Sequence, residues 1–311
     1  MLKIFYKKNK KDKLQELDYN SNIQKHSWIF VANPTKKELQ KISQDFLLDI
    51  DQLQDALDYY EVPRFDWDND KKNFYFFIRY PVSMENKILA TAPMLIILSG
   101  NLVLTIVLED SKFLEIMRQT EIDSTENRIN LMFQIIDSAV NKYNKRLIEI
   151  HKKVRKTVSK VRNINNQDIE QLVNLEYILN DYLSALLPMR EALYIMLNKK
   201  IISLDEAEKE LTEDLLLDTE QIINGIKNVL KSIQNIRDSF STIIGNKLNQ
   251  IMKTLAALTV ILTVPTIISS IYGMNIKVPL MNSPYAFWEV SSIAIISSFI
   301  IWALFAWKDW I

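Results

Sequence analysis

The chain of 311 residues contains no cysteine, only two histidines and only four glycines. Without cysteine it can form neither a disulfide framework nor a thiolate metal site, and two histidines are too few for a multi-histidine zinc site within one subunit. Scarce glycine, with abundant Leu, Ile, Lys, Glu, Asn and Gln, favours long helices over a loop-rich or all-β fold. The composition therefore predicts a protein built largely of long helices.

The bulk charge indicates no charged partner. The 38 basic residues balance the 38 acidic ones, which argues against nucleic acid as a partner. Glycine-rich phosphate turns, zinc motifs and activated nucleophiles are missing from the sequence, and His26 and His151 stand in ordinary contexts. We therefore expect neither an enzyme nor an organic substrate.

Short β-rich runs alternate with helical segments in the first 110 or so residues. The runs cover residues 2–7, 27–33, 73–82, 92–100 and 101–108. Thr35 and Glu38 have the spacing of a capping box at the start of one helix, and a second helix over 49–60 is expected to be closed by Pro63. This order predicts an α+β cytosolic domain over residues 1–120.

Three long amphipathic helices are expected next, over residues 127–162, 165–199 and 203–250. They predict an antiparallel arrangement over 121–250 whose last helix is a stalk that continues into an apolar region. Residues 141–163 hold nine basic side chains and one acidic one, whereas residues 203–221 hold eight acidic side chains and one basic one. Two readings stay open: solvated faces that attract each other, or, for the acidic run, a functional surface.

Two apolar segments near the end predict a membrane hairpin. Residues 254–272 and 290–307 contain no charge, and each has nearly the ~20 residues needed to cross about 30 Å of hydrocarbon. We place the first span at about 252–272, an external loop at 273–284 and the second span at about 285–307, within a membrane unit over 251–311. Contact with membrane lipid is therefore expected.

The charges flanking the spans indicate their orientation. Lys247, Lys253 and Lys308 lie on the side of the long helices, and the connecting loop holds only Lys277. This positive-inside bias agrees with the lack of a signal-peptide-like apolar core at the start of the chain. We expect a multi-pass protein of the cell membrane with both termini in the cytosol. Because one hairpin cannot enclose a pore, conduction would require an oligomer.

The first span carries a narrow stripe of small or hydroxyl-bearing residues at heptad spacing, and the stripe bears no charge. Two readings are open: close packing between helices, or the wall of a pore. Weak dipoles without charge suit an ion that keeps its water shell, and Mg²⁺ dehydrates reluctantly. The stripe and its cytosolic extension comprise Asn249, Met252, Ala256, Thr259, Thr263, Thr266 and Ser270.

Several segments resemble the CorA family of divalent-cation channels. The sequence "IYGMN", which ends in Gly273, Met274 and Asn275, follows the first span and precedes the second, as in that family. "ALDYYEVPRFDWDNDKKNFYFFIRYPV" (56–82), "TAPMLIILSGNLVLTIV" (91–107) and the acidic "LTEDLLLDTEQI" (211–222) are also similar to family segments. The resemblance covers most of the chain.

The resemblance implies a funnel-shaped homopentamer that transports hydrated Mg²⁺. Its external mouth and selectivity filter would be Gly273, Met274 and Asn275, with Asn275 amides binding the water shell and Gly273 ending the helix at positive φ. Thr266 and Asn249 would form polar rings. Met252 and Leu255 would form a hydrophobic constriction.

The family resemblance also implies closure by cytosolic Mg²⁺ at carboxylates between subunits. Asp214 matches such a site, with Glu213 and Asp218 as neighbours. The chain departs from the family in its outer loop, where Lys277 is present without a carboxylate, and in its "KDWI" tail, which lacks a lysine run. Two alternatives stay open: a related transporter of Zn²⁺, Co²⁺ or Ni²⁺, and a non-conducting, membrane-anchored coiled-coil scaffold.

Overall fold

The computed structural model describes residues 2–17, 26–82, 90–108, 122–158, 164–199, 201–280, 282–308 and 310. The chain divides into two compact units, Met1–Gln234 and Asn235–Ile311. Helix α6 (Glu206–Tyr272) begins in the first unit and ends in the second. The division at residues 120 and 250 stays a prediction.

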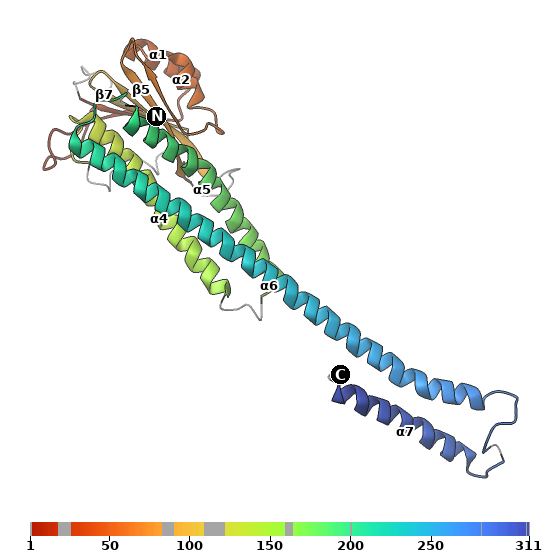
Figure 1. The fold of residues 1–311 in the computed structure, drawn as a ribbon. Coiled ribbons are helices and arrows are strands. Elements are labelled where there is room, and N and C mark those ends of the chain that lie inside the picture. Colours follow the sequence, from red (N-terminus) through yellow and green to blue (C-terminus); the bar gives the residue numbers. More distant parts are fainter. Residues whose placement is uncertain are drawn as a thin grey trace. The chain divides into compact units, whose positions relative to one another are not determined.

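One seven-stranded mixed sheet organises the first unit (Figure 1). Its order is β2-β1-β3-β7-β6-β5-β4; β3 and β7 are parallel, and the other neighbours are antiparallel. The five predicted strands are present. β2 and β4 were not predicted, because both are polar edge strands without a clear apolar alternation. The strands are β1 (Leu2–Tyr6), β2 (Gln15–Leu17), β3 (Trp28–Ala32), β4 (Arg64–Asp68), β5 (Asn73–Pro81), β6 (Thr91–Ser99) and β7 (Leu102–Val107).

Helices α1 (Lys36–Phe46) and α2 (Ile50–Asp55) follow β3. The predicted capping box is confirmed: Thr35 N donates to Glu38 Oε2 at 2.6 Å, and Glu38 N donates to Thr35 Oγ1 at 3.3 Å. The prediction of a helix through residue 60 is wrong, since α2 ends at Asp55. The chain beyond α2 instead turns its carbonyls at Tyr59 and Glu61 toward Arg79 of β5.

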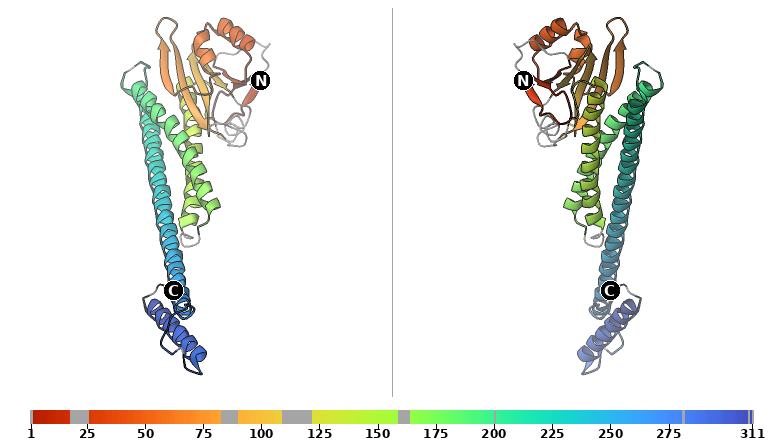
Figure 2. Two further views of the ribbon diagram at one scale, coloured as in Figure 1. Left: turned by 90° about the vertical axis from the view of Figure 1, so that its right-hand side faces the viewer. Right: turned by 90° about the vertical axis from the view of Figure 1, so that its left-hand side faces the viewer.

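Both faces of the sheet are covered. Leu39 and Ile42 of α1 and Leu53 of α2 share a buried cluster with side chains of β1, β3, β5, β6 and β7. Helices α4 (Arg128–Val158) and α5 (Asn166–Asn198) cover the opposite face (Figure 2). Burial on both faces explains why β5 and β6 read as continuous apolar runs rather than alternating ones.

The first part of α6 lies beside α4 in the same direction. A Cβ atom added to Gly225 would lie 2.8 Å from Leu147 Cδ2, so the two helices approach closely at this point. Ion pairs of the charged runs lie within single helices: Arg146 pairs with Glu149 in α4, and Lys209 pairs with Glu206 in α6. Attraction between the two runs stays a prediction, and residues 159–163 of the basic run lie outside the described residues.

Candidate ion pathway

The second unit contains two helices long and apolar enough to cross a membrane: the C-terminal part of α6 and α7 (Ala286–Trp307). Their large apolar side chains face outward in the single chain; Phe287 is 73% exposed and Ile295 is 69% exposed. A core helix of a water-soluble protein would bury such side chains. These surfaces therefore require lipid or another protein surface to cover them.

The polar stripe of α6 is not covered by its own chain. The stripe residues Asn249, Met252, Ala256, Thr259, Thr263, Thr266 and Ser270, and also Leu255, are all exposed. The less exposed positions recur on a different face, about 100–200° around the helix. We infer that this other face looks toward α7 and the segments beside it. Its residues are Lys253, Ala257, Ile261, Val264, Ile268 and Tyr272.

The stripe hydroxyls donate to their own helix. Thr259 Oγ1 donates to the Leu255 carbonyl at 2.9 Å, Thr263 Oγ1 to the Thr259 carbonyl at 2.7 Å, and Thr266 Oγ1 to the Leu262 carbonyl at 2.8 Å. Each hydroxyl has one proton, so what remains on the exposed side is the lone pairs of the oxygen. The stripe thus presents hydrogen-bond acceptors without charge.

The turn after α6 is tight, and it exposes an amide. Gly273 N donates to the Ser269 carbonyl at 2.9 Å, and Met274 N donates to the Ile271 carbonyl at 3.3 Å. The expected positive φ at Gly273 is wrong, because Gly100 is the glycine with positive φ. A Cβ on Gly273 would lie 3.3 Å from the Ser269 carbonyl oxygen, so this glycine provides space instead. Asn275 is exposed, and its side chain makes no hydrogen bond to the described residues.

Two hydrogen bonds of Ser283 connect the end of the outer loop to the start of α7. Ser283 Oγ donates to Glu289 Oε1 at 3.1 Å and accepts from Tyr285 N at 3.2 Å. Glu289 is the only acidic residue in the sequence from 239 to 308, and it stands in the first turn of α7, where a negative charge is favourable. Its other carboxylate oxygen is buried without a partner among the described residues. The sequence alone assigned no role to Glu289.

The three candidate regulatory carboxylates, Glu213, Asp214 and Asp218, are exposed on α6. Among the described residues, no group of three or more His, Cys, Asp or Glu side chains is placed to hold a metal ion. Asp218 nevertheless has an acidic neighbour that the sequence did not suggest. Burial, followed by the charge of Asp218, raises the pKa of Asp137 in α4. Asn141 Nδ2 donates to Asp137 Oδ2 at 2.8 Å.

A small cavity lies beside this pair of carboxylates. It has a volume of about 180 Å³ and presents oxygens of carboxylate and amide type, the ligands that Mg²⁺ prefers when it retains some water. Asp214 and Glu213 do not line it. The polar lining residues are Asn141, Asn144, Asp218 and Gln221.

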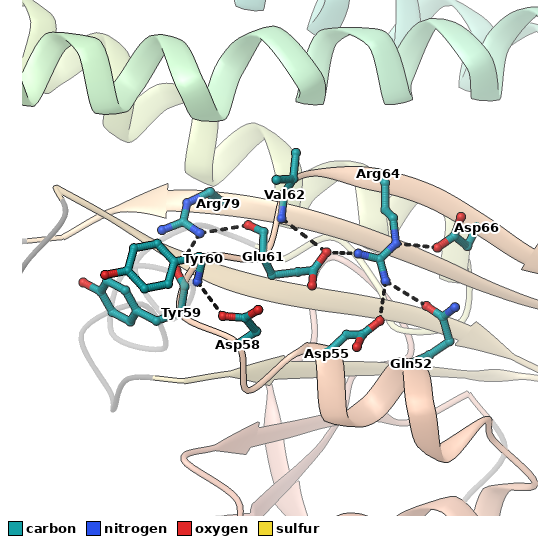
Figure 3. A network of polar contacts seen from close by, with 10 residues as sticks. All are labelled: Gln52, Asp55, Asp58, Tyr59, Tyr60, Glu61, Val62, Arg64, Asp66 and Arg79. Atoms are coloured by element: carbon teal, nitrogen blue, oxygen red, sulfur yellow. Dashed lines mark hydrogen bonds and ion pairs between the residues drawn. The ribbon is translucent and has the colours of Figure 1, made fainter.

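The segment 56–82 contains two arginines with different surroundings (Figure 3). Arg64 contacts three carboxylates: Nε to Asp66 at 2.6 Å, Nη2 to Asp55 at 2.7 Å, and Nη1 to Glu61. Arg79 is 5% exposed and donates to the carbonyls of Tyr59 and Glu61, both at 2.8 Å. This part of the sequence that resembles the family therefore fixes the loop between α2 and β4.

The model of the family described as CorA-like Mg²⁺ transporter protein matches residues 24–307. The chain belongs to the CorA family. A cobalt/magnesium transport protein CorA from Methanocaldococcus jannaschii is 29% identical over 91% of both chains. A magnesium transport protein CorA from Helicobacter pylori is 22% identical over the whole of both. These relatives are transport proteins rather than enzymes.

Among solved structures, the complete CorA magnesium transporter from M. jannaschii has a TM-score of 0.86 and 25% identity, covering 100% of this chain and 99% of that one. This CorA-family chain thus has a soluble α/β domain, a long helix and two C-terminal apolar helices that form a membrane hairpin. The full-length CmaX protein, with a TM-score of 0.75 and 14% identity, covers 98% of this chain and 96% of its own, and shares the fold.

Proposed function

We propose that this CorA-family chain transports hydrated Mg²⁺ across the cytoplasmic membrane along an aqueous path lined by the stripe of α6. The observation that carries the proposal is the state of the stripe hydroxyls. Each of these hydroxyls donates its proton to a backbone carbonyl of its own helix and leaves the oxygen lone pairs exposed. The residues are Thr259, Thr263 and Thr266. The water shell of a cation points its hydrogens outward, so it needs acceptors.

Asn275 is the proposed mouth residue. Its amide oxygen can accept a hydrogen bond from a shell water without the charge that would pull the water off the ion. The side chain is exposed and uncommitted within the described residues, which leaves it available for this contact. Gly273 and Met274 complete the turn. The close approach of the backbone at Gly273 fixes the position of the turn, and with it the position of the Asn275 amide.

Met252 and Leu255 form the proposed constriction at the cytosolic end of the stripe. They are 56% and 55% exposed in the single chain, on the same side as the hydroxyls or next to it. Rings of such side chains gate a path by excluding water. Asn249 would form a polar ring just below them.

The path requires several copies of the chain, because a single hairpin encloses nothing. We expect a homopentamer in the form of a funnel, with both termini in the cytosol. The exposed stripe and the exposed apolar surfaces of α6 and α7 support assembly in lipid. Native mass measurement of the detergent-solubilised protein tests this, and a monomer would contradict it.

Cytosolic Mg²⁺ is the proposed regulator, acting on carboxylates of α6. Asp218 is the favoured member of the group, because it lines a cavity near Asp137 and because two nearby carboxylates repel each other until a cation lies between them. Glu213 and Asp214 are exposed on the same helix and could act only with groups outside this chain's own cavity.

Uptake of Mg²⁺ into proteoliposomes by wild type and Asn275→Ala tests the mouth. We expect the variant to lose most of its uptake. Asn282→Ala is the matched control, since Asn282 is an exposed asparagine of the same loop. Equal uptake by wild type and Asn275→Ala would contradict the proposed mouth, and no uptake by wild type would favour a scaffold. Competition by Co²⁺, Ni²⁺ and Zn²⁺ tests the related transporters.

A further inference from the structure

The segment after α7 turns back instead of continuing away from the helix. Trp310 N donates to the Phe305 carbonyl at 3.0 Å, and Lys308 N donates to the Leu304 carbonyl at 3.2 Å. The Trp310 ring stacks on the Phe305 ring with centroids 5.4 Å apart and an angle of 15°. These contacts satisfy carbonyls at the end of α7 and fix the position of Trp310.

Trp310 also contacts the first span. Thr254 Oγ1 lies 3.2 Å from the Trp310 carbonyl and 3.0 Å from the Gln250 carbonyl of its own helix. A hydroxyl has one proton, so it donates to one of these acceptors at a time. Thr254 lies between Met252 and Leu255 in the sequence, at the level of the proposed constriction.

We propose that Trp310 is a positioning residue for the constriction, and that its contact with Thr254, here called the C-terminal latch, holds the cytosolic end of α6 against the end of α7. The inference rests on the proposed path along α6. If the constriction widens by a movement of α6 away from the end of α7, that movement breaks the latch. The latch therefore opposes opening.

The latch is weak by construction. When it breaks, the Thr254 proton moves to the Gln250 carbonyl, so no donor is left unsatisfied. The Trp310 carbonyl, which lies near the end of the span, can be hydrated. The stacking of Trp310 on Phe305 lies within the end of α7 and persists. The net effect is therefore that of one neutral hydrogen bond, and its loss should change the opening equilibrium by roughly two- to tenfold per chain. If the copies open together, the factors multiply.

The test uses full-length protein in proteoliposomes, with Mg²⁺ uptake measured at a series of internal Mg²⁺ concentrations. Thr254→Val removes the donor at nearly constant volume, and Trp310→Ala removes the stacking. Thr254→Ser and Trp310→Phe are conservative variants that retain the contact. Thr242→Val is the matched control, because within the described part of the chain the Thr242 hydroxyl bonds only the Asp238 carbonyl of its own helix, at 3.0 Å.

We expect Thr254→Val and Trp310→Ala to increase uptake at low internal Mg²⁺ and to require at least twofold more internal Mg²⁺ for half inhibition. The double variant should match the stronger single one, while Thr254→Ser, Trp310→Phe and Thr242→Val should match wild type. Unchanged or reduced uptake in Thr254→Val, or additive effects in the double variant, would overturn the latch. Loss of uptake in Asn275→Ala tests the mouth separately.

A second measurement tests the contact itself. Because the chain has no cysteine, Thr254→Cys with Trp310→Cys provides a clean pair for a short bismaleimide. Treatment with the bismaleimide should suppress uptake by the double-cysteine variant. The same treatment should not change uptake by either single-cysteine variant. Efficient cross-linking with undiminished uptake would overturn the proposed role.

Discussion

Arg79→Met should destabilise the soluble unit strongly, because Arg79 is buried and donates to four acceptors among the described residues. Its guanidinium donates to Thr91 Oγ1 and to the Thr91 carbonyl at 2.9 Å each, and to the carbonyls of Tyr59 and Glu61 at 2.8 Å each. Methionine keeps an unbranched apolar stem and has no donor, so the change removes all four of these bonds; it is also shorter than arginine and leaves a small space.

The change in the free energy of unfolding caused by Arg79→Met is the difference between two opposing effects. Each lost bond from a charged donor costs about 1.5–3 kcal/mol, but the Tyr59 and Glu61 carbonyls are only partly buried and can be rehydrated. Burial lowers the pKa of Arg79, which shows that the charge itself is costly to bury, and methionine removes that cost. We expect a net loss of about 2–4 kcal/mol, equivalent to a fall in Tm of roughly 10 °C.

Thermal unfolding of the full chain in detergent measures this change, with Arg64→Met as the control. The Arg64 side chain is 31% exposed, and two of its three carboxylate partners, Asp55 and Asp66, are 47% and 38% exposed, so its loss should cost less than about 1 kcal/mol. Arg79→Lys should be intermediate, because it keeps the charge but not the planar fork. Equal falls in Tm for Arg79→Met and Arg64→Met would refute the reasoning.

Two further changes test the packing and charge of the first unit. Gly225→Ala should lower Tm by a few degrees, because its Cβ would lie 2.8 Å from Leu147 Cδ2. Gly245→Ala is the control and should raise Tm slightly, because its Cβ meets nothing within 4 Å. The opposite order of Tm values would contradict the close approach of α4 and α6. The pKa of Asp137 is raised on folding, so its contribution to stability is complete below its unfolded pKa and is lost as pH rises through the folded value. Asp137→Asn should therefore raise Tm near pH 7 and reduce the added stability conferred by Mg²⁺. A Tm increment from Mg²⁺ equal to that of wild type would contradict a cation lying between Asp137 and Asp218.

The sequence predicted elements whose signals are local. The capping box of Thr35 and Glu38 is a short-range exchange of hydrogen bonds, and it forms as expected. The end of α2 could not be predicted, since it depends on Arg79, about twenty residues later, drawing the carbonyls of Tyr59 and Glu61 to itself. The conformation of Gly273 was misjudged because glycine serves both positive φ and close approach, and only coordinates separate the two.

The candidate pathway also shows what could not be predicted from the sequence. Heptad spacing in α6 could not distinguish helix packing from a pore wall, because both place small residues on one face. The structure adds two facts: α7 does not cover that face, and its threonine protons are directed inward at Leu255, Thr259 and Leu262. Packing between copies would need only small volume there, whereas a path for a hydrated cation needs acceptors at each turn. Thr263→Ala therefore separates the two, because it preserves small volume and removes the acceptor: a packing face should tolerate it, and a pore wall should conduct less.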